Sequence, residues 1–120
     1  MSKSPLHIKD LYQHRRVTHT KANIAQSQTL TTLVAAPTAV GERIAVFGLF
    51  AVCGDTATEM TLYSGSTAIS PLIANGANSG IALDPAGIPW FVCKAGEALK
   101  VTTGAGSATG IMVITANITG

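Results

Sequence analysis

The stretch RIAVFGLFAVC, residues 43–53, decides the fold class of this chain of 120 residues. It is rich in β-branched and aromatic residues and predicts a strand. Strict alternation would place on one face Ile44, Val46, Phe50 and Val52, and on the other Ala45, Phe47, Leu49, Ala51 and Cys53. Neither face suits water. One face therefore belongs to the core, and the other is covered by the N-terminal segment or by a second subunit. The scarcity of charge elsewhere in the chain favours the second subunit.

Outward from this strand, from Thr29 onward, short β-rich runs alternate with turn residues. The runs include TEMTLY (58–63), IPWFVC (88–93), ALKVTT (98–103) and IMVITANI (111–118), and the turns include GDTA, KAGE and GAGSATG. Within TEMTLY, Met60 and Leu62 alternate with Thr61 and Tyr63, as in a strand with one wet face. Seven to eight strands at this spacing predict an all-β fold: a single β-sandwich or jelly-roll-like domain.

The charge divides the chain into two parts. Residues 1–27 carry five basic residues against one acidic residue, whereas residues 28–120 carry three against five. The body is also much poorer in charge than the roughly 25% that is usual in soluble domains. We therefore predict a basic N-terminal docking arm over residues 1–27 and a β-sandwich oligomerisation body over residues 28–120.

The arm begins with the signal of a short helix. Ser4 is a suitable N-cap, Pro5 suits the first helical position, and Ile8, Leu11 and Tyr12 recur on one stripe. Residues 17–28, VTHTKANIAQSQ, hold too few apolar side chains for a core element and predict an extended tether.

Three roles are open to the arm: a solvated tail, a nucleic-acid ligand, or a segment that docks along an acidic protein surface. Its charge is thin for a nucleic-acid binder, and a solvated tail leaves the apolar stripe without a purpose. Docking on a protein uses both the apolar anchors and the charges. The docking residues predicted on this basis are Leu6, Ile8, Lys9, Leu11, Tyr12, His14, Arg15, Arg16 and Lys21.

The sequence favours no enzymatic chemistry. All three histidines lie in the arm, and the carboxylates of the body fall mostly at turns beside Gly or Pro. We predict no catalytic residue, no metal ligand and no cofactor. Cys53 and Cys93 stand 40 residues apart without a CxxC motif, which favours buried free thiols over a disulfide.

The apolar residues point instead to association between subunits. The longest strongly apolar run, residues 44–53, is far shorter than the roughly 20 residues of a spanning helix, and no apolar region of a signal peptide follows the basic N-terminus. We expect no membrane partner and folding in a cytoplasm. The predicted oligomer interface consists of Phe47, Leu49, Ala51 and Trp90, with core packing as the alternative for Trp90.

Several stretches of the body carry a family resemblance. TLYSGSTAIS, IPWFVCKAGEAL and KVTTGAGSATGIMVI, within residues 29–118, resemble the small all-β structural proteins of tailed-bacteriophage virions that accompany the major capsid protein. These motifs describe a β scaffold and no chemistry, and the arm is not part of the pattern.

The resemblance implies a capsid decoration (cement) protein on the outer surface of the virion capsid, commonly a homotrimer seated where capsid subunits meet. The expected partners are the major capsid protein and further copies of the chain. The alternative function is a receptor- or carbohydrate-binding β domain of a head fibre or tail, with a glycan site around Asn75, Asn78 and Trp90.

Overall fold

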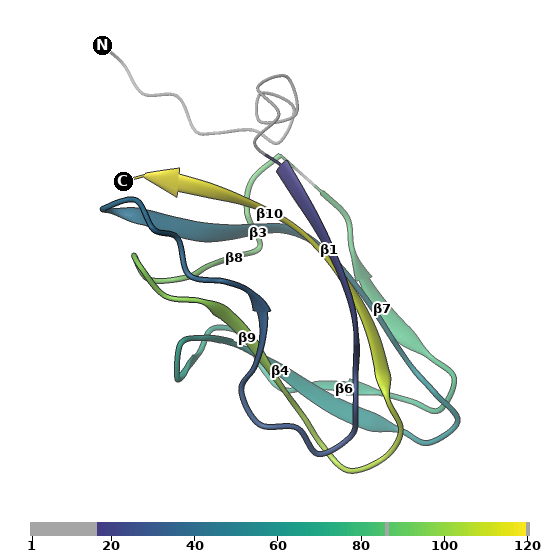
Figure 1. The fold of residues 1–120 in the computed structure, drawn as a ribbon. Coiled ribbons are helices and arrows are strands. Elements are labelled where there is room, and N and C mark those ends of the chain that lie inside the picture. The colour runs from purple at the N-terminus through teal and green to yellow at the C-terminus, as the bar shows by residue number, and fades with distance from the viewer. Residues whose placement is uncertain (1–16, 86, 120) are drawn as a thin grey trace.

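The computed structural model describes residues 17–85 and 87–119, which form ten strands in two antiparallel sheets and include no helix (Figure 1). The all-β class is confirmed, and two packed antiparallel sheets are consistent with a β-sandwich. The sequence analysis predicted seven to eight strands, and two of the ten strands in the structure have only two residues each. The predicted helix of the arm lies outside the described residues.

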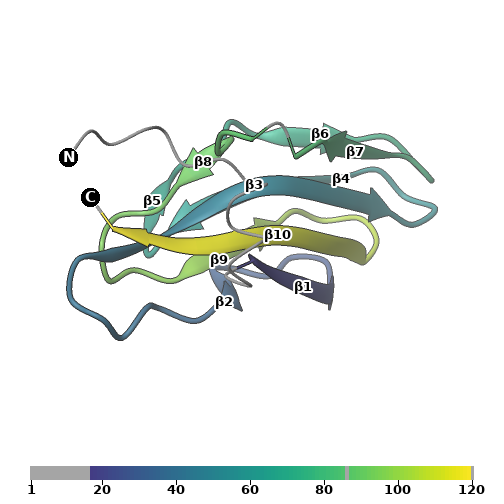
Figure 2. The same ribbon diagram turned by 90° about the horizontal axis from the view of Figure 1, so that it is seen from above.

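The first sheet, here called sheet A, has the order β1-β10-β3-β7. The strand β8 also pairs with β3, on the side opposite β10. Figure 2 shows the two long strands β3 and β10 side by side at its centre. Its strands are β1 (Val17–Ile24), β3 (Glu42–Cys53), β7 (Gly80–Leu83), β8 (Phe91–Val92) and β10 (Thr109–Thr119).

The second sheet, sheet B, has the order β2-β9-β4-β5, and β6 pairs with β4. Its strands are β2 (Thr31–Val34), β4 (Thr58–Ser64), β5 (Thr67–Ala68), β6 (Ile73–Asn75) and β9 (Leu99–Thr103). The predicted wet face is confirmed here: Met60 and Leu62 are buried, whereas Thr61 and Tyr63 remain partly exposed.

The main core lies between the sheets, because buried side chains from both contribute to one cluster. Sheet A supplies Ile44, Val46, Leu49, Ala51, Ile111 and Val113, and sheet B supplies Met60, Leu62, Leu99 and Val101. Burying each large apolar side chain contributes about 1.5–3 kcal/mol, so this cluster provides most of the driving force for folding.

The tether predicted over residues 17–28 is wrong for its first eight residues. Val17–Ile24 forms β1, which pairs in continuous register with β10 from Val17↔Ala116 to Ile24↔Thr109. The segment has few apolar residues because only one face of β1 packs on the main core, and most of its other face is exposed. Ile24 is buried, while Lys21 and Asn23 are exposed on the opposite face.

The strict alternation predicted along residues 43–53 is also wrong, because β3 contains a β-bulge. On β10, Ile114 pairs with Gly48 and its neighbour Thr115 pairs with Val46, so Phe47 is an extra residue without a partner in the ladder. A bulge of one residue exchanges the two faces of a strand. Ile44 and Val46 before it, and Leu49 and Ala51 after it, therefore all point into the main core.

A second, smaller apolar cluster lies on the outer face of sheet A. Cross-strand partners in one row share a face, and one row joins Val17, Ala116, Ala45 and Val92 across four strands. Phe47 is fully buried in this cluster, which Ile114 and Ile118 extend. The apolar side chains of β3 are thus buried on both sides over its first half.

Candidate interaction surface

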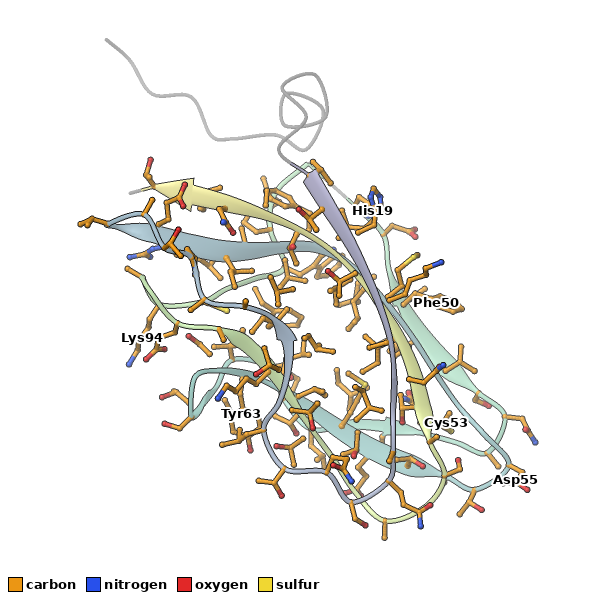
Figure 3. All side chains as sticks on the ribbon, in the orientation of Figure 1. His19, Phe50, Cys53, Asp55, Tyr63 and Lys94 are labelled. Atoms are coloured by element: carbon orange, nitrogen blue, oxygen red, sulfur yellow. The ribbon has the colours of Figure 1, made fainter. Side chains whose placement is uncertain are left out.

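Past the bulge, the outer face of sheet A is exposed and apolar. The register places Lys21, Met112, Phe50 and Ala82 in one row across β1, β10, β3 and β7. The next row of this face holds Asn23, Gly110, Val52 and Gly80. Phe50 is 50% exposed and Val52 36%, and Figure 3 shows Phe50 pointing away from sheet B. We call Phe50, Val52, Ala82 and Met112 the outer-face patch.

A groove of about 600 Å³ runs along this patch over β10. Gly110 has no side chain, and this leaves room between the neighbouring strands. Phe50, Val52 and Met112 supply apolar lining, and Lys21 and Asn23 form a polar rim on β1. A Cβ atom added at Gly110 would lie 3.3 Å from Asn23 Oδ1, so a larger residue would narrow the groove at its polar rim. The groove can receive an apolar side chain and keep a polar group at its edge.

The structure separates the four residues of the predicted oligomer interface. Leu49 and Ala51 lie in the core between the sheets, and Phe47 is fully buried in the outer-face cluster. None of these three reaches the surface of the chain, because the bulge turns Phe50 and Val52 outward in place of Leu49 and Ala51. Trp90 is exposed.

Trp90 lies at the edge of sheet A, immediately before β8. Its side chain is 46% exposed, and its neighbour Ile88 is 58% exposed. The indole N–H donates a hydrogen bond of 2.8 Å to the carbonyl oxygen of Asp84, and the backbone N–H donates one of 2.8 Å to Val46. These bonds hold the ring in place while much of it stays in solvent. We call Ile88 and Trp90 the Trp90 edge.

The residues of the alternative glycan site do not come together. Asn78 donates its backbone N–H to the carbonyl oxygen of Gly54, just beyond one end of β3, whereas Trp90 bonds to Val46 near the other end. Eight residues of strand separate these positions, or about 25 Å at about 3.3 Å per residue. Asn75 is 5% exposed and therefore presents little surface to a sugar.

Of the predicted docking residues, only Lys21 lies within the described part of the chain. It is exposed on β1 at the rim of the groove. Leu6, Ile8, Lys9, Leu11, Tyr12, His14, Arg15 and Arg16 lie outside the described residues.

Both cysteines are buried free thiols, as predicted. Cys93 donates its backbone N–H to Ile44 at the start of β3, and Cys53 ends that strand about 30 Å away. A disulfide requires Cα atoms within about 7 Å, so this fold excludes one between them. The Cys53 thiol donates to the carbonyl oxygen of Gly76 at 2.8 Å. Residues 17–85 and 87–119 contain no group of three or more His, Cys, Asp or Glu side chains placed to hold a metal ion.

Cys93 adjoins a buried polar link between β4 and the turn before β9. Ser64, itself buried, donates its hydroxyl to Glu97 Oε1 at 2.6 Å and accepts the backbone N–H of Lys94 at 2.9 Å. Burial raises the pKa of the Cys93 thiol; the hydrogen bond with Ser64 acts in the opposite direction, and the Glu97 charge adds to the rise.

We expect this raised pKa to make the fold lose stability at alkaline pH. In the unfolded chain the thiol ionises at its ordinary pKa. The contribution of the protonated Cys93 thiol to the free energy of unfolding is therefore fully present below that pKa and is lost as pH rises through the higher pKa of the folded state. Urea denaturation from pH 7 to 10 should show the loss, and a Cys93→Ala variant should show less of it. A Cys53→Ala variant is the control, and equal pH dependence of the two variants would contradict the assignment.

No helix in the described part of the chain is long and apolar enough to cross a membrane. Comparison of the sequence with protein-family models and with curated proteins, and of the chain with solved structures, gives no match. The candidate surface therefore rests on the residues themselves.

Proposed function

We propose that this chain is a non-enzymatic structural protein of a tailed-phage virion, a homotrimeric decoration protein that binds and stabilises the shell of the major capsid protein from outside. The observation that carries the proposal is the distribution of exposed apolar side chains. On a body with little charge, the outer-face patch and the Trp90 edge lie on sheet A, and clustered exposed apolar residues mark protein contacts.

The resemblance of the body to phage structural proteins supplies the biological setting of the proposal. The proposal includes two further details, a jelly-roll-like course of the strands and contact between subunits through the Trp90 edge. A tryptophan that is half exposed and fixed by a hydrogen bond of its indole N–H is the type of residue that anchors protein interfaces. The glycan-binding alternative is less favoured, because Asn78 and Trp90 lie near opposite ends of β3.

Binding to capsids tests the proposal directly. Empty shells of the major capsid protein from the same virus would be mixed with the full-length chain and with a variant that lacks residues 1–16. The deletion stops before Val17, because removal of residues 1–27 would also delete β1. We expect the full-length chain to sediment with the shells and to raise the temperature at which they disassemble, and the shortened chain to remain in the supernatant.

Circular dichroism and light scattering must show that the shortened chain still folds and forms the trimer. If the folded full-length chain does not bind the shells, the decoration function is wrong. If both chains bind equally well, the capsid contact lies in the body and the docking role of the arm is wrong. If both chains are monomers in light scattering, the trimer is wrong.

A further inference from the structure

The outer-face patch is too small to serve as a complete subunit interface. Its four residues lie on three strands, about 10 Å across at about 4.8 Å per strand spacing, and in two rows about 7 Å apart; with the width of the side chains added, each dimension is about 14 Å. The resulting area, on the order of 200 Å², is about a quarter of the 800 Å² that each partner buries in a stable protein complex. A short segment with two or three apolar side chains fits this area better than a second folded body.

The chain contains such a segment close to the groove. Residues 6–12 include Ile8, Leu11 and Tyr12, which share one stripe at helical spacing. The chain enters sheet A at Val17, which occupies the outer face together with Ala116. The row of Met112 and Phe50 lies four residues further along β1, at Lys21, or about 13 Å away.

The link between the stripe and the sheet is long enough for docking within one chain. Tyr12 and Leu11 precede Val17 by five and six residues, which span at most about 18 and 21 Å when extended. A segment lying on the sheet sits about 10 Å above it. The path from Val17 to that position above Met112 is therefore about 16 Å, which both residues can reach.

We propose that residues 6–12 dock on the groove of their own chain, with Leu11 and Tyr12 against Phe50, Val52 and Met112. The short link gives the segment an effective local concentration of the order of mM, so docking within the chain needs a lower affinity than docking between chains. This inference does not rest on the capsid proposal, because the docking occurs within an isolated chain. On capsid binding the segment would leave the groove, and the outer-face patch would then be exposed again.

The methionines of the chain allow a direct test by NMR. With ¹³C-methyl labelling, Met112 reports on the groove and Met60, which is 1% exposed in the core, is an internal control. We expect the Met112 methyl resonance of the full-length chain to shift when residues 1–16 are deleted, and Tyr12→Ala to remove the ring-current part of that shift. Leu11→Asp should reproduce the deletion, and Gln13→Ala, outside the stripe, should change nothing. The Met60 resonance should stay fixed throughout.

A mixing experiment distinguishes docking within the chain from exchange between chains. Labelled protein lacking residues 1–16 would be mixed with unlabelled full-length protein. Docking within the chain leaves the labelled Met112 resonance where it was, whereas occupation by the segment of a second copy moves it and overturns the proposal. An identical Met112 resonance in the full-length and shortened chains also overturns it. Neither result depends on capsid binding, so failure of this inference and failure of the proposed function are separate outcomes.

Discussion

Replacing Phe47 by alanine should lower the free energy of unfolding by about 3–5 kcal/mol, because the ring is fully buried and its removal leaves a cavity. Ala45 and Ala116, its buried neighbours in the outer-face cluster, are too small to fill that space. Total stabilities of small domains are about 5–15 kcal/mol, so this one change can remove much of the fold's stability. Urea denaturation monitored by circular dichroism, at one fixed protein concentration, measures the effect.

Phe50→Ala is the matched control, because the same side chain three residues further along β3 is half exposed. We expect this variant to lose less than about 1 kcal/mol. The pair also separates two accounts of Phe47. If Phe47 were an exposed interface residue, as the alternation in the sequence predicts, Phe47→Ala would dissociate the oligomer and leave each chain folded. Equal loss of stability in both variants would contradict the burial described for β3.

Gly80→Ala should be the most disruptive glycine substitution on sheet A and should cost about 3 kcal/mol or more. A Cβ atom at Gly80 would overlap the backbone carbonyl oxygen of Ala51 and lie 2.9 Å from Val52 Cα. Backbone cannot move aside as a flexible side chain can, so β7 must separate from β3. The ladder from Leu49↔Leu83 to Val52↔Gly80 would be lost, and denaturation would begin at lower urea concentration.

Gly76→Ala provides the comparison for Gly80→Ala. Its added Cβ would approach nothing closer than Ser79 Oγ at 3.7 Å, which is ordinary contact, and Gly76 lies outside the strands. We expect a change within about 0.5 kcal/mol. Hydrogen exchange should show faster exchange of the amides of β7 in Gly80→Ala only. Protection of β7 equal to that of the unchanged protein would refute the clash.

The sequence was sufficient for the all-β class because runs such as TEMTLY alternate with a period of two and have turn residues on both sides. It misled over the faces of β3, since alternation assumes an unbroken ladder and the bulge adds Phe47 to it. Gly48, inside a strongly apolar run, was the available signal, because a glycine within a strand often marks a bulge. The outer-face patch was missed for the same reason.

The strand β1 was missed for a different reason. A strand with one exposed face needs apolar residues on the other face only, and Val17–Ile24 is made mainly of Thr, Lys, Asn and His. Its assignment depends on pairing with β10, about 90 residues later in the chain, and no local pattern contains that information. The spacing of the cysteines favoured free thiols and left a disulfide open, and their positions near opposite ends of β3, which exclude the disulfide, required the fold.

The pairing of β1 and β3 with β10 also sets the order in which the protein can fold during synthesis. Both strands are made early, yet each needs residues 109–119 to complete its ladder. Contacts between residues so distant in sequence form slowly, typically in milliseconds to seconds, and a ribosome adds only about 5–20 residues per second. The apolar residues of β3 therefore spend seconds without their partner strand on each nascent chain, and this is the period in which a chaperone would protect the protein from aggregation.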